Sequence, residues 1–142
     1  MPFWAIVILV LAVLTYFYPG NVIRRRRMRE FYRRPSAEDD WSAQFPERSP
    51  EAIRDFLVMF TDAFAIREKH WRVFRPDDRL HAVYRALNVA PWNMQTDSME
   101  YEIFDLLLMK KYGVGLRGFV EESTTLGQVF GRIGATTPSA PA

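Results

Sequence analysis

The N-terminal run from Pro2 to Tyr18 contains no charged side chain, and its central part, Ala5 to Leu14, is apolar on every side of a helix. Such a helix lacks the polar face that a soluble amphipathic helix presents to water. At about 1.5 Å per residue the run covers about 25 Å, the short end of a bilayer span, and extending it to Ile23 gives a comfortable length. The sequence therefore predicts a transmembrane anchor over residues 1–23.

The charges around this run predict its orientation. No basic residue precedes the run, and seven arginines follow it closely: Arg24, Arg25, Arg26, Arg27, Arg29, Arg33 and Arg34. Because positive charge stays on the cytoplasmic side of a membrane, we expect a single-pass protein of the bacterial inner membrane with its N-terminus outside. The alternative, a cleaved signal peptide, needs basic residues before the apolar run and a small-residue cleavage site after it, and the sequence has neither.

Composition divides the rest of the chain into three parts. Residues 24–48 form a basic juxtamembrane segment and a linker, residues 49–133 form one small domain placed in the cytoplasm, and residues 134–142 form a disordered tail. The basic excess lies in the first part, so no nucleic-acid partner is expected for the domain. The chain has no cysteine, which excludes disulfides, thiolate metal sites and a cysteine nucleophile.

Helix signals predict an all-α domain. Ser49 and Pro50 begin a helix that should reach Ile66, and its apolar stripe repeats at intervals of three and four residues. A capping box of Asp97 and Glu100 begins a second helix that ends near Tyr112, and a further box begins at Thr125. Residues 67–96 form a long ordered connection with a short helix at 80–87. The expected core includes Phe56, Phe60, Ile103, Leu107, Leu126 and Phe130.

Few residues offer catalytic chemistry. His70 and His81 are eleven positions apart in the least regular region and are interpreted as surface residues. Asp77 and Asp78 fit a helix cap better than a cation site, since one acidic pair supplies too few oxygens for calcium. The sequence therefore predicts neither an enzyme nor a metal site.

One constellation does indicate a function. Asp97-Ser98-Met99 opens an amphipathic helix, and the short helix led by Thr124-Thr125 follows after 26 residues. This pattern resembles the acyl carrier protein superfamily, in which an Asp-Ser-Leu at the second helix carries 4′-phosphopantetheine and a Thr-Thr-led helix completes a four-helix bundle. Residues 113–119 are also similar to a bacterial branch of acyl-carrier-like proteins of uncharacterised function. The resemblance implies a small acyl-carrier-like four-helix bundle with the prosthetic group covalently bound to Ser98.

The resemblance also implies partners. A phosphopantetheinyl transferase would install the arm with the help of Asp97, and the protein would present its acyl group to membrane-associated acyl-transfer or synthase enzymes of lipid or secondary metabolism. The acidic residues Glu100, Glu102 and Asp105 would form a docking surface for basic patches on those enzymes. The alternative is an unmodified helical interaction module of the same fold that recruits or regulates a partner protein at the inner membrane.

Overall fold

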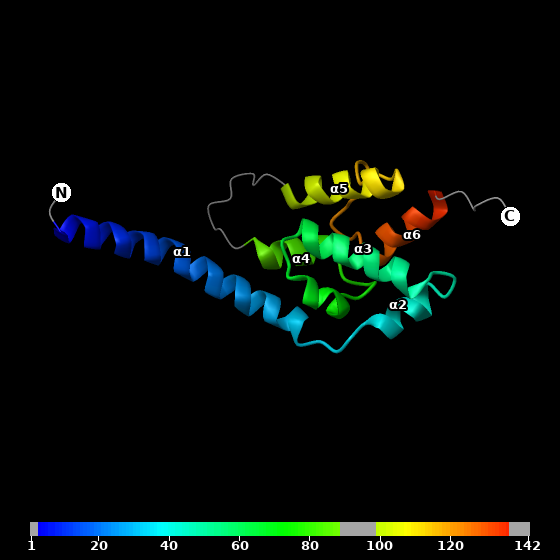
Figure 1. Cartoon of the computed structure of the whole chain (residues 1–142), viewed down its shortest axis with the longest axis horizontal. Coiled ribbons are helices and arrows are strands. Elements are labelled where there is room, and N and C mark those ends of the chain that lie inside the picture. The colour runs from blue at the N-terminus through cyan, green and yellow to red at the C-terminus, as the bar shows by residue number, and fades with distance from the viewer. Residues whose placement is uncertain (1–2, 89–98, 137–142) are drawn as a thin grey trace.

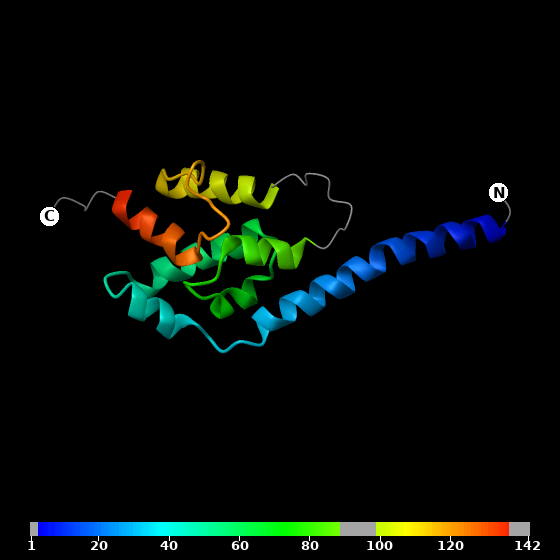
Figure 2. The ribbon, with the colours of Figure 1, turned by 180° about the vertical axis from the view of Figure 1, so that it is seen from behind.

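The computed structural model describes residues 3–88 and 99–136, and every regular element in this part of the chain is a helix. A long first helix leads into a body of shorter helices, as Figure 1 and the opposite view in Figure 2 show. The helical class agrees with the prediction. The elements are α1 (Phe3–Tyr32), α2 (Glu38–Gln44), α3 (Pro50–Ala63), the 3-10 helix η1 (Glu68–Val73), α4 (Leu80–Leu87), α5 (Met99–Tyr112) and α6 (Leu126–Thr136).

The transmembrane part of the prediction is wrong. Within residues 3–88 and 99–136, no helix has both the length and the apolar character that crossing a membrane requires. A bilayer span takes about 20 consecutive apolar residues, whereas α1 continues from its charge-free part directly into the arginine cluster. This finding overturns the anchor over residues 1–23 and, with it, the single-pass topology and the inner-membrane localisation.

The basic half of α1 belongs to the folded body and is not a separate juxtamembrane segment. Met28 and Phe31 are buried in the core, with exposed fractions of 1% and 9%. Arg24 and Arg27 donate hydrogen bonds to backbone carbonyls of the segment after α3 and of α4, at 3.4 and 3.3 Å. The last turns of α1 therefore pack on the helical body through both apolar and polar contacts.

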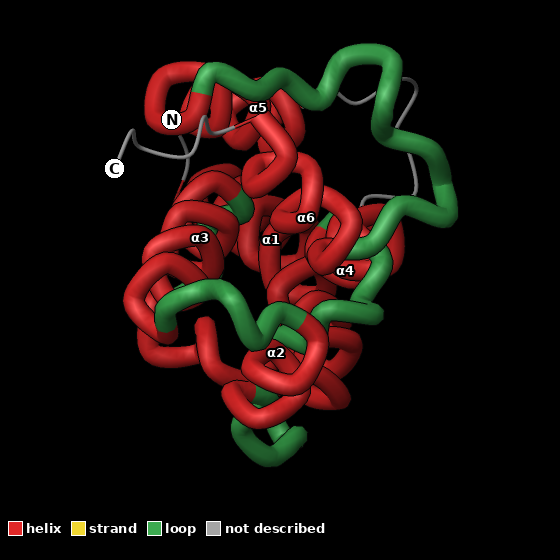
Figure 3. Tube along the Cα trace, turned by 90° about the vertical axis from the view of Figure 1, so that its right-hand side faces the viewer, coloured by secondary structure: helices red, strands yellow, loops and turns green. Residues whose placement is uncertain are grey.

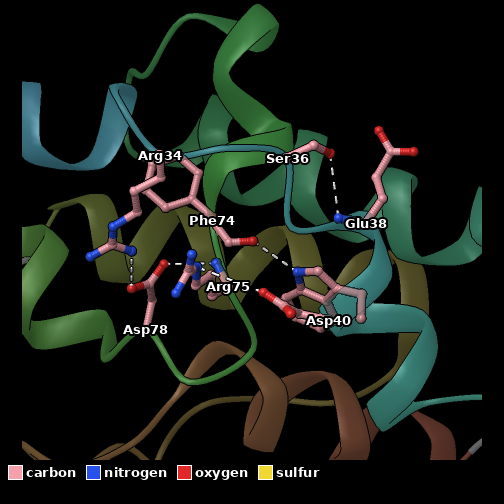
Figure 4. Close-up of polar contacts among 8 residues, drawn as sticks. Arg34, Ser36, Glu38, Asp40, Phe74, Arg75 and Asp78 are labelled. Carbon is pink, nitrogen blue, oxygen red and sulfur yellow. Dashed lines mark hydrogen bonds and ion pairs between the residues drawn. The ribbon is translucent and has the colours of Figure 1, made fainter.

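An ion pair joins the end of α1 to the turn before α4. The Nη1 atom of Arg34 lies 2.6 Å from Oδ1 of Asp78, a carboxylate whose residue is buried (Figure 4). The other carboxylate oxygen of Asp78 accepts a hydrogen bond from the backbone N–H of Arg75 at 2.7 Å. Asp78 is thus a structural acceptor within a turn. Its interpretation as a helix cap is wrong, because the N-cap residue of α4 is Arg79 and no side chain caps that helix.

The linker predicted within residues 24–48 is wrong where α2 forms. Trp41 is 1% exposed, and its indole N–H donates to the carbonyl oxygen of Phe74 at 2.8 Å. A seven-residue helix with a single buried residue has no repeating apolar pattern, so the sequence showed no helical period there. The segment is held against the body by Trp41, by the ring of Phe45 on Phe130, and by the backbone hydrogen bond from Ala37 to Arg72.

Helix α3 begins as predicted and ends early. The Ser49 hydroxyl accepts a hydrogen bond from the N–H of Ala52 at 3.1 Å, and Pro50 occupies the first turn. The helix ends at Ala63 because Ala65 adopts a φ of 51°, the left-handed conformation that stops a helix. Its buried side chains face the centre of the body.

The core is rich in aromatic rings, several of which come from α2, α3, α5 and α6. Phe56 of α3 lies 5.1 Å from Phe130 of α6 and 6.0 Å from Phe104 of α5, measured between ring centroids. Phe60 packs edge-on against Phe104 at 5.7 Å, and Trp41 of α2 meets Phe130 at 5.6 Å. Such tilted and edge-to-face pairs add to the free energy that burial supplies. The core thus joins α2, α3, α5 and α6.

The core prediction holds for Phe56, Phe60, Leu126 and Phe130, all of which are buried, and is wrong for α5. Ile103 is 40% exposed and Leu107 is only partly buried, whereas Phe104 and Leu108 are fully buried. Helix α5 has apolar residues of its own on nearly all sides, so spacings of three and four residues fit two opposite faces equally well. The true inner face was the one containing Phe104.

Helix α6 begins at the predicted capping box. The N–H of Thr125 donates to Oε1 of Gln128 at 2.9 Å, and the N–H of Gln128 donates to the Thr125 hydroxyl at 3.2 Å. Residues 78–80 pair with residues 124–126 by two backbone hydrogen bonds around an isolated bridge between Arg79 and Thr125. This pairing connects the start of α4, which forms as predicted, to the start of α6. The predicted disordered tail, residues 134–142, is wrong over 134–136, which continue α6, and residues 137–142 lie outside the described residues.

Candidate functional site

The candidate site centres on the beginning of α5. The helix starts at Met99, the residue that directly follows Ser98. Ser98 and Asp97 themselves lie outside the described residues, as does the rest of the segment 89–98. The free backbone N–H groups of the first turn and the positive end of the helix dipole would lie beside a group attached at that position.

A groove of about 880 Å³ runs along one side of α5. Its other walls are the loop between α5 and α6 and the beginning of α4. The aromatic and aliphatic lining residues are Tyr101, Leu106, Met109, Leu116 and Val120, and the ionisable lining residues are His81, Glu102, Asp105, Arg117, Glu121 and Glu122. Tyr101, one of the lining residues, follows the predicted attachment point Ser98 by three positions in the sequence.

The three predicted docking acids differ in their surroundings. Glu102 is exposed and Glu100 is half-buried, and neither forms an ion pair with another described residue. The Asp105 carboxylate instead accepts a hydrogen bond from the backbone N–H of Leu116. Asp105 therefore holds the far wall of the groove against α5, and only Glu100 and Glu102 are open to a partner.

Two further contacts hold the wall of the groove. The hydroxyl of Thr124 accepts a hydrogen bond from the N–H of Glu121 at 2.8 Å. Glu122 pairs with Arg85 of α4 at 3.0 Å and lies 3.9 Å from His81 Nε2. The Thr124 hydrogen bond lies within the loop between α5 and α6, whereas the ion pair of Glu122 joins this loop to α4.

Tyr101 is the polar group of the apolar lining. Burial, reinforced by Tyr84 and Glu100, raises the pKa of Tyr101 to about 12, so its hydroxyl remains a hydrogen-bond donor at neutral pH. Its ring packs on Tyr84 and Phe64 at centroid distances of 5.1 and 5.6 Å. The hydroxyl is buried and has no hydrogen-bond partner among the described residues. The sequence reasoning missed this residue, because a tyrosine in an apolar helix carries no positional signal.

The two histidines have different surroundings. His70 stacks on Tyr32 of α1 with ring centroids 3.9 Å apart, and burial, together with Lys69 and Arg67, lowers the pKa of His70. His81 borders the groove. Within the described residues, no group of three or more His, Asp or Glu side chains is placed to hold a metal ion.

Comparison of the chain with protein-family models, with curated proteins and with solved structures finds no match in any of the three. The resemblance to acyl carrier proteins therefore stays a prediction from the sequence pattern, and the site must be argued from its own geometry.

Proposed function

We propose that the chain is an acyl-carrier-like protein that bears 4′-phosphopantetheine on Ser98 and presents a thioester-linked acyl group to enzymes of lipid or secondary metabolism. The observation that carries this proposal is the position of α5, which begins immediately after Asp97-Ser98 and has an apolar groove along its side. Catalysis belongs to the partner enzymes, and the chain supplies the attachment point and the surface that they bind.

The described residues fit such a group. A phosphodiester on Ser98 would lie at the positive end of α5, where unpaired backbone N–H groups favour an anion. The apolar side chains of the groove, beginning with Tyr101, offer a surface to the arm and its acyl chain. When bound, the prosthetic group supplies the thiol that this cysteine-free chain lacks. Asp97 is expected to cap the helix and to help bind the transferase.

Glu100 and Glu102 are the residues that we assign to partner enzymes. Both follow Ser98 within the first turn of α5, so a basic patch that reaches the arm also comes close to them. Complementary charge raises the rate at which two proteins meet in the correct orientation. Asp105 acts as a positioning residue, through its hydrogen bond to the N–H of Leu116.

The test is the covalent addition of the arm to the full chain. We expect incubation with coenzyme A and a broad-specificity phosphopantetheinyl transferase to add the mass of one phosphopantetheine. The Ser98→Ala variant should gain none, and the control Ser123→Ala, which removes an exposed serine of the loop before α6, should be modified like the wild type. If the wild type stays unmodified in this assay and when isolated from its own cells, the carrier proposal fails.

One observation favours the alternative of an unmodified interaction module. The outer face of α5 exposes apolar side chains, among them Leu106 with an exposed fraction of 66%. Such a face suits protein association with or without an arm. Absence of the arm together with capture of a specific partner through α5 would support the module over the carrier.

A further inference from the structure

The outer face of α5 carries an apolar stripe that no described residue covers. Met99, Ile103 and Leu106 are 58%, 40% and 66% exposed, and they follow each other at intervals of four and three residues. The next position in this series is Lys110, whose side chain is exposed and forms no ion pair with any described residue. Intervals of four and three produce the narrow seam along which two helices pack.

Helix α5 is placed where another helix could reach this stripe. It lies along one edge of the helical body in Figures 1 and 2, and in the end-on view of Figure 3 it again lies at the outer boundary. Its opposite side, with Phe104 and Leu108, is packed on the core. The stripe is therefore a face of the folded domain and is already formed before any partner binds.

The charges of α5 are segregated along its length. Glu100 and Glu102 are in the first turn, and Lys110 and Lys111 are in the last turn. Lys111 is paired with Asp55 of α3 at 3.1 Å, whereas Lys110 forms no ion pair with a described residue. Two copies of α5 in parallel would place like charges side by side, whereas two antiparallel copies place the acids of each beside Lys110 of the other.

We infer that two copies of this chain associate through antiparallel packing of their α5 helices. In the symmetric register, Ile103 packs opposite Leu106 of the second copy, and Met99 packs against the methylene stem of Lys110 of the second copy. The ammonium group of each Lys110 then lies within reach of Glu102 of the other chain. A two-fold axis makes the surface complementary to itself, so the assembly closes as a dimer.

This inference shares Leu106 and Glu102 with the groove and the docking surface of the proposed function, but it does not depend on whether Ser98 is modified. The two proposals are tested by different measurements, one of covalent mass and one of proximity between two chains. A failed modification would leave the dimer unaffected, and a failed cross-link would leave the carrier proposal unaffected.

The absence of cysteine permits a direct test with single thiols in the full chain. A disulfide requires Cα atoms about 4.4–6.8 Å apart, so only residues that face each other can join. We expect an equal mixture of Met99→Cys and Lys110→Cys chains to give cross-linked dimer under mild oxidation at several times the yield of either variant alone. A mixture of Met99→Cys with Glu47→Cys, a thiol in an exposed loop, measures random collision.

Two substitutions test the stripe and the charges in the same assay. Leu106→Glu in both chains should reduce the yield to the collision level, with an unchanged circular dichroism spectrum since Leu106 is largely exposed. Glu102→Lys in the Lys110→Cys chain should lower the yield, and Lys110→Glu in the Met99→Cys chain should then restore it. Glu47→Lys, the same charge change in an exposed loop, should have no effect.

Two results would overturn the inference. If Met99→Cys by itself gives as much cross-linked dimer as the mixture, or more, the helices are parallel or the contact is random. A yield that Leu106→Glu leaves unchanged would mean that the stripe is not the contact.

Discussion

Helices α3 and α5 have the same length, 14 residues, and both pack on the aromatic core, yet they bury their apolar residues very differently. In α3 the apolar residues gather on one face, most of them are buried, and none beyond the first turn is exposed. In α5 they lie on two opposite faces, and only Phe104 and Leu108 are fully buried. The difference indicates that α3 only stabilises the fold of the chain, whereas α5 both packs on the core and presents a second apolar surface.

Truncating the buried phenylalanines should produce the largest effects on both helices. Phe60→Ala on α3 and Phe104→Ala on α5 each remove a fully buried ring from the same core, which should lower the free energy of unfolding by about 3–5 kcal/mol. Denaturant unfolding followed by circular dichroism measures the change. A near-neutral Phe104→Ala would show that α5 does not bury this face.

The eighth residue of each helix is a leucine and gives a matched pair. Leu57 of α3 is 1% exposed, and Leu106 of α5 is 66% exposed. We expect Leu57→Ala to cost about 2–5 kcal/mol and Leu106→Ala to stay within about 0.5 kcal/mol. The measurement uses the lowest workable protein concentration, so that association of two chains does not contribute. Similar costs for both leucines would contradict the comparison.

Raising the pH should destabilise the packing of the inner face of α5, which carries the titratable hydroxyl of Tyr101. Burial raises the pKa of Tyr101 to about 12 from an ordinary value of 10.0, so the unfolded chain loses the phenolic proton first. The contribution of Tyr101 to stability is therefore complete below pH 10 and is lost as the pH rises toward 12. We expect the denaturation midpoint to fall over this range.

The Tyr101→Phe variant is the control for this prediction, because it keeps the ring and removes the ionisation. Its midpoint should fall less between pH 10 and 12 than that of the wild type, with Tyr32 accounting for part of the remaining loss, since burial also raises the pKa of Tyr32. Identical pH profiles for Tyr101→Phe and the wild type would count against a buried hydroxyl.

The smallest effect concerns the start of α3. Ser49→Ala removes the hydroxyl that accepts the N–H of Ala52 and should cost about 1 kcal/mol. Ser42→Ala, an exposed serine within α2, should change stability by less than about 0.5 kcal/mol. Equal values for the two serines would mean that the cap contributes nothing beyond an ordinary surface serine.

The sequence alone determined the elements whose signals are local. Ser49 and Pro50 mark the start of α3, Thr125 and Gln128 mark the start of α6, and the stripe of α3 marks its buried face. These predictions succeed because a cap involves residues a few positions apart, and because a helix with a single apolar face can be buried in only one way. The predicted attachment at Ser98 also rests on local pattern, and it awaits the mass measurement.

Only the tertiary structure decided the features that depend on distant residues. The burial of Trp41 requires Phe74 and Phe130, the partial burial of Asp78 requires Arg34, and the groove requires the loop that Asp105 holds. Likewise, contacts of Phe104 with Phe56 and Phe60 of α3 determine which of the two apolar faces of α5 is buried. A local pattern reports that a side chain is apolar, but which neighbour removes it from water depends on how the whole chain packs.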